Sequence, residues 1–136
     1  MTPGESAYSQ EQLAVAERAL LEAATLLKSE LVEGAVSRLY YAVFHAARAA
    51  LASRGRTTRT HSGQIKTFNE VFGPAPILGE LLKLRSDADY GEGIDKSVED
   101  LRTPAAEAAA FLARCRELVA EGIGAGPDEP DPPPDL

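Results

Sequence analysis

The stretch SRLYYAVFHAARAAL, residues 37–51, decides the fold because it has the pattern of one helix with two different faces. Apolar side chains repeat every three or four residues, as on a helix that packs against a core. This apolar row consists of Leu39, Val43, Ala46 and Ala50. A polar row lies on another face of the same helix. This polar stripe consists of Arg38, Tyr41, His45 and Arg48.

Two members of the polar stripe suggest chemistry on phosphate groups. Arg38 and His45 are seven residues apart, which is two helical turns, so their side chains leave the same face. Histidine exchanges protons near neutral pH, and arginine offers a permanent charge with a planar fork of donors that fits phosphate. This pair suits the cleavage of a phosphodiester. The same spacing also arises from a solvated arginine and a packed histidine on an alanine-rich helix.

The rest of the chain predicts further helices and no strand. Ser9 followed by Gln12 has the form of a capping box at a helix start. Gly34 separates the first two helices, Gly55 ends the second, and Gly73 with Pro74 ends the third. The predicted helices cover residues 9–31, 34–53, 62–72, 76–89 and 103–122. We therefore expect an all-α, up-and-down helical bundle of four main helices plus a short helix.

The composition bounds the domain organisation and the setting of the protein. A chain of 136 residues fits one domain. We expect a flexible N-terminus over residues 1–8, a helical domain over 9–123 and a disordered, acidic, proline-rich tail over 124–136. Cys115 is the only cysteine, which excludes an internal disulfide and fits a reducing, cytoplasmic location. Charges interrupt every apolar run and no signal-peptide pattern is present, so neither a membrane span nor secretion is expected.

The net charge of −7 is unevenly distributed. Residues 34–69 contain six Lys or Arg side chains and no acid, whereas the tail is acidic. The basic residues are Arg38, Arg48, Arg54, Arg56, Arg59 and Lys66. Because the local field decides what a surface attracts, the negative total does not exclude a nucleic-acid partner.

Three motifs occur in the order in which they occur in one known family. SRLYYAVFHAARAAL (37–51) is followed by TRTHSGQIKTFNEVF (58–72) and then by LLKLRSDADYGEG (81–93). Together they resemble the HEPN superfamily of small all-α proteins, and most of all its free-standing bacterial branch. The resemblance covers about residues 10–120 and is far more specific than the Arg38/His45 pair alone.

The resemblance implies a homodimer in which the motif helices of two subunits meet, so that one cleft holds two Arg/His pairs. Arg38 and His45 match the form of the family motif with six residues between arginine and histidine. The implied reaction is RNA cleavage without a metal or other cofactor, in which a ribose 2′-OH attacks the neighbouring phosphate. We thus predict Arg38 and His45 as catalytic residues. The predicted substrate-binding residues are Tyr41, Arg48, Arg54, Arg56, Arg59 and His61.

Other functions stay open on the sequence alone. The leading hypothesis is an RNA-cleaving or RNA-binding toxin or defence protein, with an antitoxin as a possible partner. The alternatives are a non-catalytic nucleotide-binding module that serves a separate minimal nucleotidyltransferase, and a purely structural helical dimer. Leu39 replaces a polar residue that follows the arginine in many active members, and Ala47 replaces the tyrosine that is modified in toxin members. Control by tyrosine adenylylation is therefore not expected.

Several polar residues allow a structural interpretation as well as a functional one. His61 lies where a helix begins and suits phosphate, but it equally suits a residue that orders the loop while Thr60 or Ser62 caps the helix. The arginines of residues 54–59 fit either RNA backbone contacts or a solvated basic loop. Tyr41 fits either a substrate contact or an interface aromatic residue.

Two structural expectations concern the fourth and second helices. The segment with Arg85, Asp87, Asp89 and Tyr90 is expected to be an ion-pair and packing junction, since carboxylates two residues apart on a helix point in different directions. The second helix has apolar residues on more than one side, which predicts a symmetric dimer that buries it. The residues behind this expectation are Val36, Tyr40, Val43 and Phe44.

Overall fold

The computed structural model is built from five α-helices and one short 3₁₀ helix, and it describes residues 2–90 and 95–125. No strand occurs among these residues, so the predicted all-α fold is confirmed. Of the five helices, α3 is the shortest, as the sequence predicts. The elements are α1 (Pro3–Lys28), α2 (Val32–Ala52), α3 (His61–Phe72), α4 (Pro76–Tyr90), η1 (Glu99–Leu101) and α5 (Arg102–Ala125).

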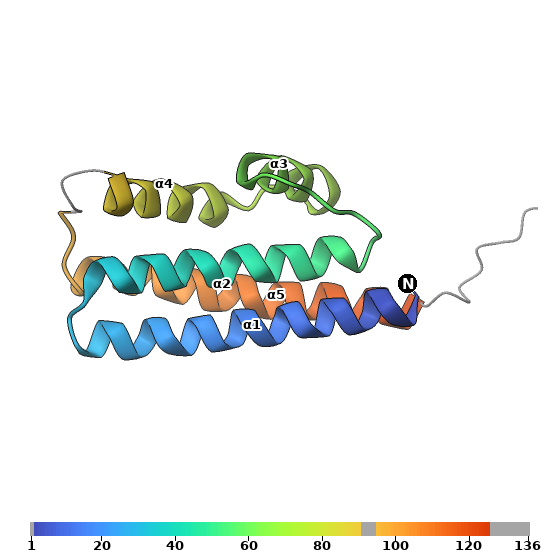
Figure 1. The fold of residues 1–136 in the computed structure, drawn as a ribbon, viewed down its shortest axis with the longest axis horizontal. Coiled ribbons are helices and arrows are strands. Elements are labelled where there is room, and N and C mark those ends of the chain that lie inside the picture. Colours follow the sequence, from blue (N-terminus) through green and yellow to red (C-terminus); the bar gives the residue numbers. More distant parts are fainter. Residues whose placement is uncertain (1, 91–94, 126–136) are drawn as a thin grey trace, which may run out of the picture.

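Helix α2 is the central element of the bundle. It runs antiparallel to α1 along almost its whole length, and α5 lies behind this pair (Figure 1). The short α3 and then α4 lie on the other side of α2 from α1 (Figure 1). One side of α2, the side that faces the viewer in Figure 1, is therefore left open between α1 and the α3–α4 layer.

The first helix begins earlier than predicted. Thr2 is its N-cap, Pro3 occupies the first turn, and Glu5 completes a capping box by accepting the Thr2 N–H at 2.9 Å. The predicted start at Ser9 is wrong, and residues 3–8, expected to be flexible, form the first turns of α1. Ser9 is buried because it faces α2, where its hydroxyl donates to the Ala49 carbonyl at 3.0 Å.

Two other boundaries differ from the prediction by a few residues. Gly34 lies inside α2 and not before it, and a Cβ there would meet the Leu26 side chain at 3.4 Å, so the glycine lets α1 and α2 approach closely. Helix α5 begins at Arg102, directly after the 3₁₀ turn and one residue before its predicted start. Pro104 still lies in the first turn, where proline is tolerated.

The predicted breaks after α2 and α3 are confirmed. Gly55 has φ of 71° and Gly73 has φ of 95°, a region of backbone conformation that side chains with a Cβ rarely adopt. Each glycine ends the preceding helix and turns the chain toward the next one. The loop over residues 53–60 thereby carries the basic segment from the end of α2 to the start of α3.

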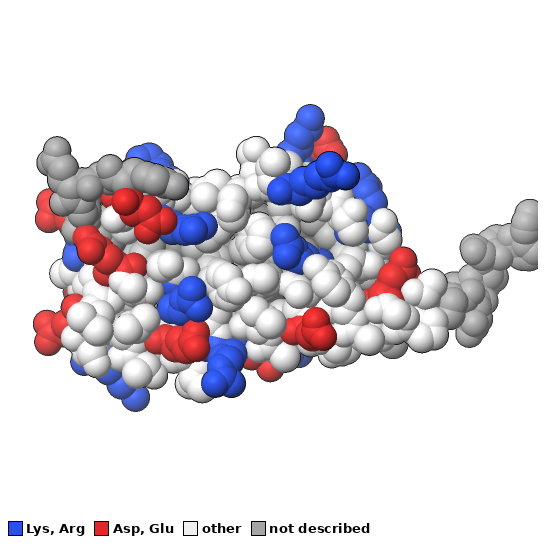
Figure 2. Space-filling view, in the orientation of Figure 1, with Lys and Arg blue, Asp and Glu red and all other residues white. Residues whose placement is uncertain are grey.

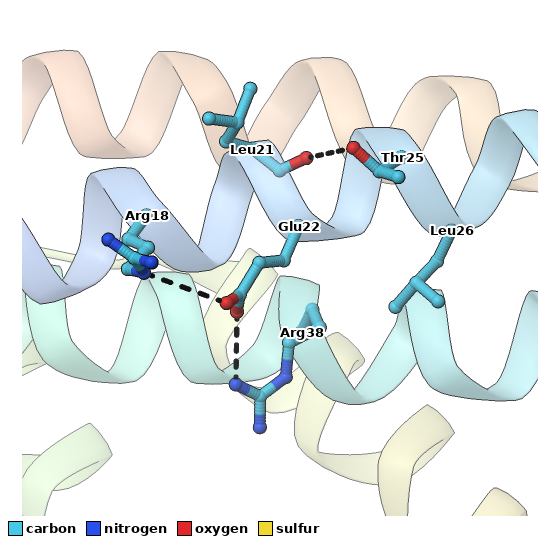
Figure 3. A pocket seen from close by; sticks show the side chains of 6 residues that line it. All are labelled: Arg18, Leu21, Glu22, Thr25, Leu26 and Arg38. Carbon is cyan, nitrogen blue, oxygen red and sulfur yellow. Dashed lines mark hydrogen bonds and ion pairs between the residues drawn. The ribbon is translucent and has the colours of Figure 1, made fainter.

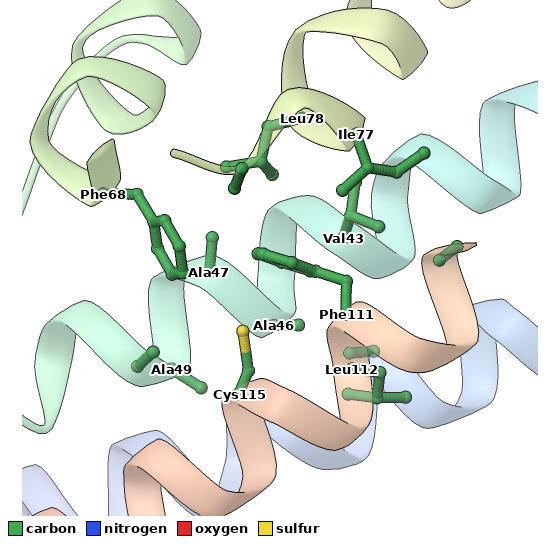
Figure 4. Close-up of a cluster of buried hydrophobic side chains, with 14 of the residues drawn as sticks. Val43, Ala46, Ala47, Ala49, Phe68, Ile77, Leu78, Phe111, Leu112 and Cys115 are labelled. Atoms are coloured by element: carbon green, nitrogen blue, oxygen red, sulfur yellow. The ribbon is translucent and has the colours of Figure 1, made fainter. Parts of the chain in front are cut away.

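Small side chains of α2 form the middle of the core. Ala46, Ala47 and Ala50 are completely buried, which lets neighbouring helices pack close to the α2 backbone. Phe68 from α3 and Phe111 from α5 fill the space beside these alanines, with ring centroids 5.2 Å apart (Figure 4). The predicted apolar row of α2 is buried in full, and this fixes which face of α2 remains for function.

The reason given for a dimer needs correction. Val36, Tyr40 and Val43 are at most 2% exposed, because α1, α4 and α5 of the same chain already cover them. Only Phe44, among the residues on which that expectation rested, is half-buried. Val36, Tyr40 and Val43 therefore offer no surface to a second copy. The predicted disordered tail lies, from residue 126 onward, outside the described residues.

Candidate functional site

The four residues of the polar stripe lie on one side of α2 and differ in how far they are exposed. Arg38 and Arg48 are half-buried, and Tyr41 is 39% exposed. His45 is only 8% exposed, since neighbouring aromatic rings cover it. The structure brings together Arg38, Tyr41, His45 and Arg48 on one side of α2, as the sequence predicts, and Gln12 of α1 helps to bury His45.

Gln12 of α1 fixes the ring of His45. The His45 Nδ1 atom is 2.5 Å from the Gln12 Oε1 atom, which can only accept a hydrogen bond. The proton of the neutral ring therefore sits on Nδ1, and Nε2 keeps its lone pair. Tyr41 and Phe44 hold the ring from two sides, with centroids 4.2 and 5.2 Å from that of His45.

The environment of His45 keeps the ring neutral. Burial, and then the positive charges of Arg48 and Arg38, lower the pKa of His45 to about 4. At neutral pH the ring is therefore unprotonated at Nε2 and can accept a proton. An anion placed between the two arginines would offset their charges and raise this pKa.

Arg38 is positioned by one carboxylate and one aromatic ring. Its guanidinium carbon lies 4.5 Å from the Tyr41 ring centroid, and its Nη1 is 3.3 Å from Glu22 Oε1 on α1. Glu22 is shared, because Arg18 approaches its other oxygen at 3.8 Å (Figure 3). These residues border an open groove of about 620 Å³ between α1 and α2. Both side chains of the Arg38–Glu22 pair are partly solvated, so the ion pair adds little to the stability of the fold. Its main effect is to hold Arg38 in position.

His61 contacts the ring of Phe44, which also contacts His45. It is the first residue of α3, is exposed, and has its ring centroid 4.9 Å from that of Phe44. Its Nδ1 is 2.5 Å from the Tyr40 hydroxyl. Burial raises the pKa of Tyr40 to about 12, so this hydroxyl keeps its proton and can donate it to Nδ1. With Tyr40 as the donor, the proton of the neutral His61 ring sits on Nε2.

The start of α3 is held by a side-chain cap. The Thr60 hydroxyl accepts the Gly63 N–H at 2.9 Å, which is the capping role that the sequence offered for Thr60. A Cβ on Gly63 would lie 2.7 Å from that hydroxyl, so the glycine makes room for the cap.

Arg48 links the two histidines. Its guanidinium carbon lies 4.7 Å from the Phe44 ring centroid, and Phe44 contacts both His45 and His61. Its charge contributes to lowering the pKa of His45 and, after burial and Arg85, the pKa of His61. Arg48 is therefore the cation that both rings share.

The three arginines of the basic loop have different surroundings. Arg54 donates to the Leu118 carbonyl at 3.1 Å and lies 3.7 Å from the Glu121 carboxylate, so it joins the loop to α5. Arg56 and Arg59 are exposed. The predicted RNA backbone contact therefore rests on Arg56 and Arg59, while the surroundings of Arg54 are those of a structural residue.

Helix α4 contributes ion pairs to the edge of the site. Arg85 lies 3.2 Å from Asp89, and Lys83 lies 3.4 Å from Asp87, which confirms the ion pairs expected for this segment. The Arg85 guanidinium carbon is 5.5 Å from the Tyr40 ring centroid. In the part of the chain that the structure describes, no three His, Cys, Asp or Glu side chains form a group that could hold a metal ion.

Sequence reasoning missed Gln12, Glu22 and the hydroxyl of Tyr40. Gln12 was assigned to a helix cap, although its spacing from Leu13 and Ala16 places it on the buried face of α1. A polar residue on that face, opposite a histidine on the next helix, is the signal that could have found it. The sequence presents Tyr40 only as one of the apolar residues of the second helix; its ring is buried, but its hydroxyl contacts His61.

Basic and acidic side chains concentrate on different parts of the surface. On the face drawn in Figure 2, Lys and Arg side chains follow the middle of the surface between α1 and the α3–α4 layer. Asp and Glu side chains gather toward the end where α1 turns into α2. The helices within the described residues include none with the length and apolar character needed to cross a membrane.

Comparison with known proteins gives a consistent result. The family model for the HEPN domain matches residues 9–119. A UPF0332 protein of Gloeobacter violaceus is 33% identical over 115 residues, which are 78% of this chain and 91% of the relative. A UPF0332 protein of Thermotoga maritima is 30% identical over 112 residues, 76% of this chain and 85% of the relative. A Methanocaldococcus jannaschii protein named "Putative toxin MJ0605" is 32% identical over 118 residues, 79% of this chain and 85% of the relative.

Proposed function

This chain belongs to the HEPN family, and from that premise we propose that it is a metal-independent endoribonuclease whose active site forms between two copies. The observation that carries the proposal is the open stripe itself. There Gln12 holds His45 through Nδ1 and leaves Nε2 out of that hydrogen bond, and the charges of Arg38 and Arg48 act on the ring.

The proposed reaction needs a base, an acid and a cationic cradle. His45 Nε2 takes the proton of a ribose 2′-OH, whose oxygen bonds to the neighbouring phosphorus. The bond from phosphorus to the 5′ oxygen breaks, and that oxygen takes a proton from the His45 of the second copy. The products are a 2′,3′-cyclic phosphate and a 5′-hydroxyl end. Arg38 and Arg48 stabilise the charge that builds on the phosphoryl oxygens.

A second copy supplies what one stripe lacks. A stripe has a single histidine, and the low pKa of His45 suits the base and not the acid. The phosphate of a bound RNA offsets the charges of the flanking arginines, which raises the pKa of the rings around it and allows one of them to be protonated. Tyr41 is the most exposed residue of the stripe, at 39%, and we propose that it lies in the contact between copies.

The toxin name of the Methanocaldococcus jannaschii relative suggests a biological setting. We propose that this chain acts on cellular RNA as a toxin or defence protein and that a second protein restrains it. Covering the open side of α2 would block both the stripe and the meeting of two copies. A restraining partner that acts in this way would lower activity without any covalent change.

The decisive test is cleavage of an RNA pool by the purified protein with EDTA present. We expect cleavage with cyclic phosphate ends, and a loss of about 10²–10⁴-fold in His45→Ala, the usual contribution of an acid or base. Circular dichroism of both proteins controls for folding. A folded dimer that cleaves no RNA would refute the nuclease proposal. The same stripe would then be better explained as a nucleotide-binding module, with Arg38 and His45 holding phosphate.

The dimer has its own test. Light scattering at micromolar concentration should show two copies for the wild type. Tyr41→Arg should shift the protein to monomer, because it adds like charges where the two stripes meet. Cleavage should be lost together with the dimer. A wild-type protein that is active as a monomer would overturn the composite site.

A further inference from the structure

A second hollow lies next to the polar stripe, where the start of α1, the end of α2, the basic loop and α3 meet. Its volume is about 270 Å³, and it is more enclosed than the groove beside Arg38. Buried residues of the last turn of α2 form its floor. The polar residues that line it are Tyr8, Arg48, Arg56, Thr57, Thr58 and Gln64.

The lining of this hollow suits an anion. It presents two guanidinium groups and three hydroxyl groups, and none of its lining residues carries a carboxylate. Among the residues that the structure describes, Arg48 and Arg56 have no carboxylate oxygen within ion-pair distance. Glu5 lies beside Gly55, outside the lining, where it is bound to the N–H of Thr2.

The wall of the hollow is held in place by Gln64. This side chain is 1% exposed; its Nε2 donates to the Phe44 carbonyl at 2.8 Å, and its Oε1 accepts from the Thr58 hydroxyl at 3.5 Å. Each end of the amide therefore makes one hydrogen bond, and the side chain joins the loop to α2. The hydroxyl of Thr57 and the guanidinium of Arg56 remain available for a ligand.

Arg48 connects the hollow to the proposed active site. It lines the hollow and also contributes to the low pKa values of both histidines. An RNA whose scissile phosphate lies at His45 would thus bring a neighbouring phosphate toward Arg56. The small volume suits one phosphate with part of its sugar, since sites that enclose a whole small molecule measure about 300–1,000 Å³.

We propose that this hollow is a phosphate subsite that binds the phosphate next to the scissile one in single-stranded RNA. The proposal rests on the nuclease proposed above. It assigns ligand contacts to Arg56 and Thr57, and it gives Arg48 a place in both sites. Arg59 lies in the same loop but does not line the hollow, so it contributes only general charge.

Arg56→Gln and its matched control Arg59→Gln test the subsite. The probe is a fluorescein-labelled, uncleavable 2′-O-methyl oligoribonucleotide, and binding is followed by fluorescence anisotropy over a range of salt concentrations. Arg56→Gln should weaken binding on the order of tenfold, as for a lost hydrogen bond to a charged group. It should also reduce the salt slope by about 0.7, the value for one phosphate contact on a single strand. Arg59→Gln should change both far less.

Two outcomes separate this proposal from the nuclease itself. If the wild type cleaves RNA but both variants weaken binding equally, the subsite is wrong and the nuclease proposal stands. If the wild type binds the probe through Arg56 but cleaves nothing, the subsite stands and the nuclease proposal fails. Both arginines are exposed, so neither change should unfold the protein, and melting curves of the two variants check this.

Discussion

The two histidines of this chain both contact the Phe44 ring but have opposite surroundings. His45 is buried on the central helix, and Gln12 accepts the proton of its Nδ1. His61 is exposed at the start of a short helix, and its Nδ1 is hydrogen-bonded to the Tyr40 hydroxyl. In their neutral forms, His45 therefore offers a lone pair at Nε2, whereas His61 offers an N–H there when Tyr40 is the donor.

The difference shows that the hydrogen-bond partner, and not the residue type, decides what each histidine can do. A base must keep a free lone pair on a ring that does not turn, and this describes His45. His61 suits a hydrogen bond to a phosphate or a loop-ordering role, since its lone pair is already used. Four experiments can break or sharpen this comparison.

The largest difference in RNA cleavage is expected between two arginines, Arg38 for His45 and Arg85 for His61. Arg38→Ala should reduce RNA cleavage by about 10²-fold or more, as His45→Ala should, because it removes charge stabilisation at the phosphate. Arg38→Lys should recover only part, since an ammonium group cannot reproduce the fork. Arg85→Ala, beside His61, should cost much less. Equal losses at Arg38 and Arg85 in single-turnover kinetics would contradict the asymmetry.

The next effect concerns stability against pH. The pKa of His45 falls from 6.5 in the unfolded chain to about 4 in the fold, so the unfolded state binds a proton first as the pH drops. The free energy of unfolding should therefore decrease between about pH 6.5 and 4, by about 3 kcal/mol from this residue. Urea unfolding at fixed protein concentration measures it, and His45→Gln should lose this part. Identical pH curves for wild type and variant would show that His45 does not titrate as described.

A smaller effect is expected at His61. His61→Ala should reduce cleavage less than tenfold and lower stability by about 1 kcal/mol, the usual value of one hydrogen bond. Tyr40→Phe removes the same hydrogen bond from the other side and should have a similar effect on stability. A loss at His61 as large as that at His45 would give His61 a direct part in proton transfer, and cleavage rates of the three variants decide between these roles.

The smallest effect is expected for the tail. Removal of residues 126–136 should change the free energy of unfolding by no more than about 0.5 kcal/mol, because proline and like charges oppose packing. Both histidine environments should stay as they are. A large fall in the melting temperature would mean that the tail packs on the domain and would place a further element beside one of the two rings.

The helical architecture could be predicted from sequence because local signals agreed with each other. Alanine and leucine periodicity, the glycine at 55 and the glycine at 73 indicated where α2 and α3 end. The start of α1 could not be predicted, since Ser9 and Gln12 match a capping box and only the position of α2 reveals that both face inward. A local pattern cannot tell a cap from a buried polar contact.

The residues of the candidate site that lie on one helix could be predicted from the sequence. The contacts made between helices could not. The stripe from Arg38 to Arg48 follows from helical spacing alone. The partners Gln12 and Tyr40 depend on which helices are neighbours and on how each ring is turned. The same limit explains the loop arginines, which are alike in sequence although Arg54 contacts α5 and Arg56 lines a hollow.

Arg48 has a consequence for the energetics of binding. Because its charge lowers the proton affinity of both His45 and His61, an RNA phosphate that neutralises it raises both affinities together. Binding of RNA must then be accompanied by uptake of protons from the buffer, more strongly as the pH falls. Calorimetric titrations in buffers with different heats of ionisation would count these protons. In Arg48→Gln the count should fall, since the rings would already have lost the cation that the phosphate offsets.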